Sequence, residues 1–343
     1  MTIGFFARRL DDLMQMLGRA PRRIGKADKT AEALALEAFK RTPEERRRRL
    51  DAIRAEEAEG VVSHKWRIRR WASILAVNGL FVASFWVDLQ LVEGALTASR
   101  VLGFHFADLN SSLQLMLAHG HVVLNLLIGV TTVLLLYLFF GGRAFCSWVC
   151  PYHLVSEIAE MVHLKLAARG LVTDHDLDRR LRPVMFVVFA ALAFGSGYTL
   201  FETISPVGIL SRGMTYGTVA ALLWVGVLLL VEVFWSRRFW CRYVCPIGLT
   251  YGFVGLATPV RVLWDAEKCL HEGKCRQVCL VPHVLETTKL GRSSDVRSPI
   301  GSDCTRCAMC LDVCPSGALS FDIAGITRRP PPGVPGQPAR EDA

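Results

Sequence analysis

The chain has 343 residues, of which 52% are hydrophobic and 21% are charged, and its formal net charge is +9. Soluble domains rarely reach so apolar a balance. The basic residues gather beside apolar runs, which argues against a nucleic-acid partner and favours a membrane protein.

The two ends of the chain differ from its middle. Residues 1–65 are expected to form a charged helical tail on the cytoplasmic side, because Thr42 followed by Pro43 is typical of a helix start among charged residues. We assign this tail no chemistry. Residues 326–343 are rich in Pro and Gly and are expected to be disordered.

Residues 66–264 are expected to form a membrane domain. Their four uncharged runs, each long enough to cross a bilayer as a helix, are 71–87, 121–140, 183–201 and 214–231. Segment 141–182 holds six Lys and Arg residues, whereas 88–120 and 202–213 hold one each. Since basic loops stay inside, we predict an α-helical integral membrane protein with four transmembrane helices in two tandem pairs. It would be a multi-pass protein of the bacterial inner membrane with both termini cytoplasmic.

A duplicated cysteine motif marks each helix pair. Cys146-x3-Cys150-Pro151 recurs 95 residues later as Cys241-x3-Cys245-Pro246. Two thiols four positions apart lie on the same face of a helix. The two pairs could meet as a four-thiolate site, hold a transition metal, take part in redox exchange or simply pack. Their duplication favours a redox or metal role.

Residues 265–325 are expected to form a ferredoxin-like α+β module with two iron–sulfur clusters. Its clearest motif is Cys304-x2-Cys307-x2-Cys310-x3-Cys314-Pro315, the spacing of bacterial ferredoxins. Zinc is the alternative, but structural zinc sites usually consist of two separated Cys-x2-Cys knuckles. The motif therefore predicts a [4Fe-4S] cluster.

A second, imperfect run precedes it, with Glu272 where a cysteine is usual. In two-cluster ferredoxins the fourth cysteine of each run binds the other cluster. Accordingly, the predicted ligands of the first cluster are Cys304, Cys307, Cys310 and Cys279, and those of the second are Cys269, Cys275, Cys314 and Glu272. Because a carboxylate is a harder ligand than a thiolate, the second cluster is expected to be either [4Fe-4S] or [3Fe-4S]. Alternatively, Glu272 faces solvent and this cluster never forms.

Four sequences together resemble the NapH/MauN group of membrane-bound ferredoxin-type proteins: GRAFCSWVCP, SPVGILSRG, CRYVCPIG and CTRCAMCLDVCP. The resemblance covers about residues 66–325. It implies a quinol dehydrogenase component that takes electrons from the quinone pool and passes them through iron–sulfur clusters to a periplasmic iron–sulfur or cytochrome c partner. The chain departs from the group at Glu272 and in its long N-terminal tail.

Quinol oxidation requires a proton acceptor, and ionisable residues within a membrane domain are candidates. The weak candidates here are His119, His121, Asp108 and Glu202. For each of them the alternative is an interfacial side chain without a role. Two other functions stay open: copper reduction and maturation of the CcoG type, in which the paired thiols bind Cu(I), and a structural anchor for a redox complex.

Overall fold

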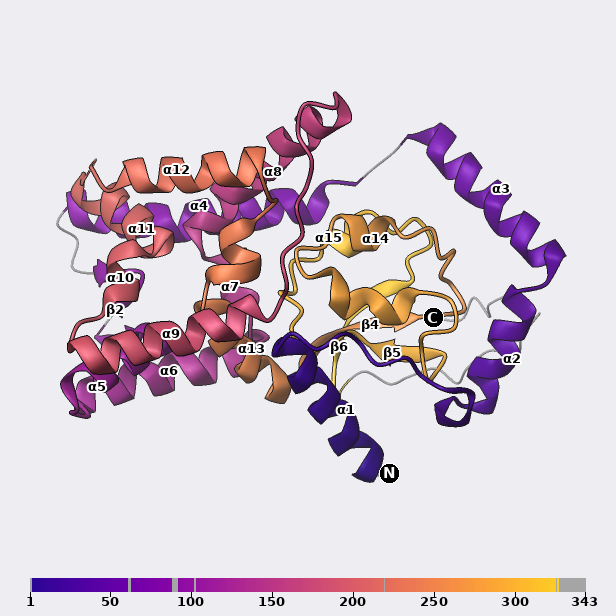
Figure 1. Ribbon diagram of the computed structural model, residues 1–343, viewed down its shortest axis with the longest axis horizontal. Coiled ribbons are helices and arrows are strands. Elements are labelled where there is room, and N and C mark those ends of the chain that lie inside the picture. Colours follow the sequence, from indigo (N-terminus) through magenta and orange to yellow (C-terminus); the bar gives the residue numbers. More distant parts are fainter. Residues whose placement is uncertain are drawn as a thin grey trace. The chain divides into compact units, whose positions relative to one another are not determined.

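The structure is a computed structural model, and the residues that it describes are 2–60, 63–87, 92–101, 103–218, 220–324 and 326. Internal contacts divide the chain into two units (Figure 1), of which unit 1 comprises Met1–Arg19 and Ile68–Thr258 and unit 2 comprises Ala20–Arg67 and Pro259–Ala343. Each unit is therefore built from two separate stretches of sequence. The tail predicted at 326–343 lies outside the described residues, apart from residue 326.

Unit 1 is mainly helical. Its helices are α1 (Thr2–Met16), α4 (Lys65–Trp86, of which the first three residues belong to unit 2), α5 (Leu109–His119), α6 (Leu124–Phe140), α7 (Ala144–Trp148), α8 (Pro151–Ala168), α9 (Leu181–Ser196), α10 (Leu200–Ile204), α11 (Pro206–Tyr216), α12 (Leu222–Phe234), the π-helix η2 (Trp240–Val244) and α13 (Ile247–Ala257). An antiparallel sheet of order β1-β2-β3 joins them, with β1 (Val92–Ala95), β2 (Ala98–Val101) and β3 (Phe104–Ala107). Helix α9 packs along α5, and α12 packs along α8 (Figure 1).

The core of unit 1 is aromatic where the two repeats meet. The rings of Phe145 and Tyr251 stack with centroids 5.1 Å apart, and Tyr137 meets both edge-on. Gly142, with φ of +49°, allows this approach, because a Cβ built there would lie 2.4 Å from the Cα of Gly255. The glycine thus brings the turn before the first cysteine pair directly against α13.

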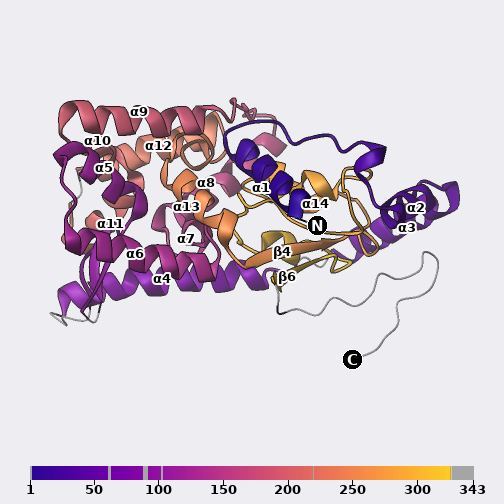
Figure 2. The same ribbon diagram turned by 90° about the horizontal axis from the view of Figure 1, so that it is seen from below.

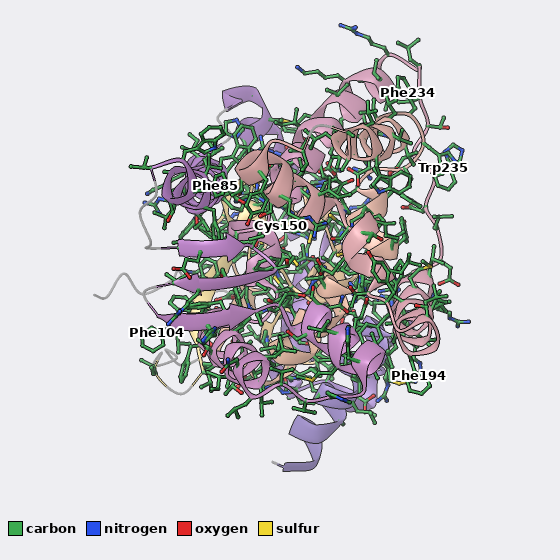
Figure 3. All side chains as sticks on the ribbon, turned by 90° about the vertical axis from the view of Figure 1, so that its left-hand side faces the viewer. Phe85, Phe104, Cys150, Phe194, Phe234 and Trp235 are labelled. Carbon is green, nitrogen blue, oxygen red and sulfur yellow. The ribbon has the colours of Figure 1, made fainter. Side chains whose placement is uncertain are left out.

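Apolar side chains also cover much of the outside of unit 1. Phe85, Phe104, Phe194, Phe234 and Trp235 point outward in Figure 3, with exposed fractions between 40% and 74%. Cys150, by contrast, lies inside the unit in the same view and is 6% exposed. The apolar runs of the sequence therefore supply both the interior and the surface of this unit.

The predicted transmembrane helices are the main correction. Among the described residues, no helix combines the length and the apolar character needed to cross a membrane. Two apolar runs are broken at glycines with positive φ: Gly197 ends α9 after 16 residues, and Gly217 separates α11 from α12, which has only 13 residues. Helix α4 has 22 residues but begins with four basic residues among its first six. The prediction of a four-span integral membrane protein is therefore wrong, and so is the predicted multi-pass inner-membrane localisation with cytoplasmic termini.

Unit 2 combines a three-stranded antiparallel sheet with short helices. The sheet has the order β5-β4-β6, with β4 (Val260–Asp265) between β5 (Arg297–Pro299) and β6 (Leu319–Ile323), and Figure 2 shows β4 beside β6. The other elements are α14 (Lys274–Gln277), the 3-10 helix η3 (Pro282–Thr288) and α15 (Met309–Asp312). Cys269 and Cys304 lie 35 positions apart, as do α14 and α15. The module is therefore an internal repeat.

The segment 20–67 contacts this module extensively. It contains the 3-10 helix η1 (Lys26–Asp28), α2 (Ala31–Lys40) and α3 (Pro43–Glu59). The amide of Thr30 donates to the carbonyl of Ser294 at 2.9 Å, and the Asp312 carboxylate accepts from the amides of Trp66 and Arg67 at 2.9 and 3.2 Å. The segment is thus an integral part of unit 2.

Candidate functional site

Three cysteines of unit 2 line one cavity together with Glu272. They are Cys269, Cys275 and Cys314, and the cavity has about 350 Å³ of empty space, part of it open to solvent. Burial raises the pKa of Cys275, and the nearby Cys269 and Cys314 thiols raise that pKa further. The structure therefore brings together the residues expected to hold the second cluster.

The other four cysteines of unit 2 form a second group. Burial raises the pKa of Cys279, followed by the charges of Cys307 and Cys304, and the pKa of Cys310 is raised by burial and by the same two thiols. Cys279 thus interacts most strongly with the run that begins 25 positions later in the sequence, and less strongly with Cys275 of its own run. This grouping is the one expected from the crossing arrangement of two-cluster ferredoxins.

The backbone shapes both cysteine loops in the same way. His271 and Arg306, each two residues after the first cysteine of its run, have φ of 59° and 52°, and Gly273 and Ala308 have φ of 91° and 59°. The left-handed residues turn amides toward sulfur: the amides of His271 and Arg306 lie 3.4 Å from the Sγ atoms of Cys269 and Cys304. Thiols around a cavity, with amides pointing at sulfur, fit an iron–sulfur cluster.

Glu272 occupies the position equivalent to Cys307 and has partners of its own. Its Oε2 atom lies 3.3 Å from Lys274 Nζ, which also donates to Glu56 Oε1 at 3.1 Å. Burial and then the neighbouring Glu56 raise the pKa of Glu272. A cluster iron would therefore compete with Lys274 for this carboxylate.

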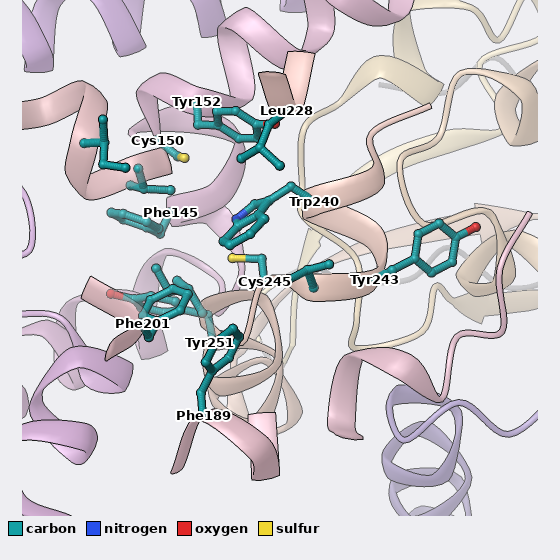
Figure 4. Packing of buried hydrophobic residues seen from close by; sticks show 14 of the residues in the cluster. Phe145, Cys150, Tyr152, Phe189, Phe201, Leu228, Trp240, Tyr243, Cys245 and Tyr251 are labelled. Carbon is teal, nitrogen blue, oxygen red and sulfur yellow. The ribbon is translucent and has the colours of Figure 1, made fainter. Parts of the chain in front are cut away.

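The Cys-x3-Cys-Pro pairs of unit 1 converge. Cys146 lies in α7 and Cys150 caps α8, whereas Cys241 lies in η2 and Cys245 ends it. Burial raises the pKa of Cys245 to about 12, with the Cys146 thiol as the next cause. Burial, then Glu232, and then the Cys245 and Cys150 thiols raise the pKa of Cys241. Figure 4 shows Cys150 and Cys245 among the buried aromatic side chains of the core. Among the described residues, no three His, Cys, Asp or Glu side chains are grouped closely enough to hold a single metal ion.

The duplication has diverged beside these thiols. The 95-residue offset that relates the cysteines also relates Tyr137 to Glu232 and Ser156 to Tyr251. Glu232 is fully buried and accepts from the Tyr152 hydroxyl at 3.0 Å, the Ser156 hydroxyl at 2.6 Å and the Trp240 amide at 3.2 Å. One repeat thus has a buried carboxyl group near its cysteines, and the other has a phenol.

A buried charged network next to η2 was not anticipated from the sequence. Nε2 of His153 lies 2.7 Å from the Arg70 guanidinium and 3.3 Å from that of Arg238, and Arg70 also pairs with Glu157 at 2.5 Å. Burial and the two guanidinium charges lower the pKa of His153, which therefore stays neutral and accepts hydrogen bonds. The one sequence feature that could have indicated this network is the repeated motif, to which Arg238 belongs. Because Arg238 precedes Cys241 by three residues, the network fixes the backbone that leads to that thiol.

The four proton-acceptor candidates separate into two kinds. The Ser111 hydroxyl contacts Asp108 Oδ2 at 3.1 Å and also contacts Glu202 Oε1, so the structure joins these two carboxyls. Burial raises the pKa of both Asp108 and Glu202. A hydroxyl donates one proton to one acceptor, so the two carboxyls compete for the Ser111 hydroxyl. His119 and His121 are exposed and lie outside this pair.

Lys40 is a further residue that the sequence did not single out. It ends α2, is 3% exposed, and donates from Nζ to the carbonyl oxygens of Ala266 and Cys269 at 2.5 and 2.6 Å. Burial lowers its pKa to about 8, which leaves it charged at neutral pH. A cation from segment 20–67 thus reaches the loop of a candidate cluster ligand.

Comparison with known families supports iron–sulfur binding. Residues 122–168 and 218–261 match a family model described as a 4Fe-4S binding domain. These segments contain the two Cys-x3-Cys-Pro pairs, whose duplication predicted only a general redox or metal role. The prediction of iron–sulfur clusters is confirmed at this level.

Several curated proteins are similar to the chain over most of its length. The methylamine utilization ferredoxin-type protein MauN of Methylorubrum extorquens is 34% identical over 293 residues, which cover 82% of this chain and 99% of the relative. The ferredoxin-type protein NapH of Escherichia coli is 30% identical over 271 residues, covering 78% and 91%. MauN of Paracoccus denitrificans is 34% identical over 236 residues, covering 68% and 82%. No solved structure matches the chain.

Proposed function

We propose that this chain, which belongs to the family of ferredoxin-type proteins that includes MauN and NapH, oxidises a quinol and delivers the electrons to a periplasmic iron–sulfur or cytochrome c partner. The resemblance inferred from its motifs is confirmed by these relatives. Iron–sulfur electron transport follows from the family and from the matched 4Fe-4S model. The quinol and the acceptor are the parts that we add.

The observation that carries the quinol proposal is the carboxyl pair in unit 1. Oxidation of a quinol to a quinone releases two electrons and two protons, so the site needs a proton acceptor as well as an electron acceptor. Asp108 and Glu202 share Ser111, and burial followed by the charge of Asp108 raises the pKa of the nearby Tyr251. Tyr251 in turn stacks on Phe145, the residue before Cys146. A proton acceptor is thereby linked to the core that holds the first cysteine pair.

The cysteines supply the electron-transfer part of the proposal. We assign one [4Fe-4S] cluster to Cys304, Cys307, Cys310 and Cys279, and a second, [4Fe-4S] or [3Fe-4S], to Cys269, Cys275 and Cys314 with Glu272 beside it. A bound cluster accepts and donates one electron at a time. The four thiols of unit 1 are assigned a redox role of the same kind, which their match to a 4Fe-4S model supports.

The test is electron paramagnetic resonance of the anaerobically purified protein, with iron and sulfide assayed. A reduced quinol is added first and dithionite second. We expect iron–sulfur signals that change on addition of the quinol. Signals that respond to dithionite alone would exclude quinol as the donor, and zinc in place of iron and sulfide would overturn the cluster assignment as well.

Glu272→Cys tests the composition of the second cluster. Because position 272 matches Cys307 in register and the residues on either side of both positions have left-handed φ, a thiol there completes a four-cysteine set. We expect iron content to rise by about one iron per chain and any three-iron resonance to disappear, since a three-iron cluster lacks one corner of the four-iron form. Glu272→Gln is the matched control and should leave the thiol count and any three-iron resonance unchanged. If the unsubstituted chain shows a three-iron resonance, an iron content that stays the same in Glu272→Cys would show that this position is not a cluster corner.

A further inference from the structure

Lys40 is placed as a fixed cation rather than as a surface charge. Its ammonium group is buried and its two hydrogen-bond acceptors are both backbone carbonyls, those of Ala266 and Cys269. No carboxylate among the described residues lies within ion-pair distance of it, although the charges of Glu45 and Asp265 raise its pKa. Burying an ammonium group is costly unless nearby negative charge compensates. A cluster held by thiolates at Cys269, Cys275 and Cys314 would supply that negative charge.

The surroundings of Lys40 hold it in this position. The Arg49 guanidinium donates to the Lys40 carbonyl at 2.6 Å, which ties α3 to the end of α2. At the start of α2, the Thr30 hydroxyl accepts from the Ala33 amide and the Thr30 amide donates to Ser294. Hydrogen bonds therefore hold both ends of α2, and the Lys40 side chain extends from the end of this helix to the cysteine loop.

The internal repeat of unit 2 gives an independent observation. The carbonyl of Cys304, which is equivalent to that of Cys269, accepts a 2.7 Å hydrogen bond from the Arg306 guanidinium of its own loop. The residue equivalent to Arg306 is His271, whose Nδ1 lies 2.8 Å from the Thr288 carbonyl instead. Each loop thus has one cation on the carbonyl of its first cysteine. In the imperfect loop the cation comes from segment 20–67.

We propose that Lys40 is a positioning residue that raises the reduction potential of the cluster assigned to Cys269, Cys275 and Cys314, taking the place that Arg306 holds in the other loop. The inference rests on the proposed assignment of these cysteines as ligands. Reduction adds one negative charge to a cluster, and a buried cation nearby stabilises the reduced form. Segment 20–67 would therefore set the order in which the two clusters of unit 2 accept electrons.

The test is a redox titration of the full chain at pH 7, followed by electron paramagnetic resonance. In Lys40→Gln, which keeps a neutral donor, we expect the ratio of reduced to oxidised second cluster at a fixed potential to fall about tenfold, or 59 mV for one electron. The signal is identified by its loss in Cys275→Ser. Lys40→Arg keeps the charge and should restore the original midpoint, and the other cluster should not shift.

Lys29→Gln is the matched control. Lys29 is a buried lysine of the same segment, but its partner is the Glu37 carboxylate rather than a cysteine loop. A Lys40→Gln protein with its clusters intact and its midpoints unchanged would overturn the inference. So would an equal shift in Lys40→Arg, because charge would then not be the cause. If the unsubstituted chain lacked the second cluster, the ligand assignment in the proposed function would fail first.

Discussion

Cys279→Ser and Cys310→Ser are expected to remove the same cluster, although the two residues belong to different runs. Cys279 lies with Cys304, Cys307 and Cys310: after burial, the Cys307 and Cys304 thiols raise the pKa of Cys279, and Cys279 in turn raises that of Cys310. Each variant should lose about four irons per chain, the content of one [4Fe-4S] cluster. Cys275→Ser and Cys314→Ser should instead remove the other signal. The measurement is iron and sulfide content together with the resonance spectrum of each variant.

The pairing of variants is what makes this test decisive. If Cys279→Ser removed the same signal as Cys275→Ser, each run would hold its own cluster and the crossing assignment would be wrong. Ser320→Ala is the control for handling and folding, because Ser320 is exposed on β6 and is not among the residues that line the cysteine cavity, whereas its neighbour Leu319 is. It should keep both signals and its full iron content.

The spacing of the cysteines predicted which residues form the two candidate cluster sites of unit 2, because the cysteine loops are local structures. The run from Cys304 to Cys314 predicts its own turn, and the run at 269–279 follows by register, with Glu272 in the place of Cys307. The left-handed residues at both loops show why the register holds: the same backbone path is used twice. What spacing alone could not provide was the depth of burial of the Cys-x3-Cys-Pro pairs.

The helix predictions failed for a physical reason. The apolar composition of a segment indicates how much surface is favourably removed from water, but it does not indicate where the backbone turns. The positive φ values at Gly197 and Gly217 end helices inside runs that read as continuous. Part of the apolar content also serves the outer surface of unit 1, as Phe194 and Phe234 show.

Long-range polar contacts were beyond sequence reasoning for a different reason. The Lys40–Ala266 hydrogen bond joins residues 226 positions apart, and the Arg70–His153 contact joins residues 83 apart. A lysine or a histidine in an amphipathic segment has no local feature that distinguishes a buried partner from solvent. Only the packing of the separate stretches of each unit brings these groups together.

Asp108→Asn combined with Glu202→Gln should abolish quinol-driven reduction while leaving reduction by dithionite intact. An amide cannot accept the proton that quinol oxidation releases, and loss of a general base typically costs about 10²- to 10⁴-fold in rate. We therefore expect the rate of cluster reduction by quinol to fall by at least about 100-fold. Stopped-flow absorbance with quinol and then with dithionite separates this effect from loss of the clusters.

The pH dependence of the quinol-driven rate provides a second test of the same carboxyl pair. Burial raises the pKa of both Asp108 and Glu202 above the ordinary carboxyl value. The acceptor must be ionised to take a proton, so the quinol-driven rate of the unsubstituted chain should increase as pH rises through those elevated pKa values. The double variant should lose this increase.

Glu93→Gln is the control, because Glu93 is an exposed carboxyl of the same unit, and this variant should keep both the rate and its pH dependence. If the rate fell in His119→Ala or His121→Ala but not in the double variant, the proton acceptor would be a histidine rather than the Asp108–Ser111–Glu202 contact. The quinol ring would then have to bind near that histidine.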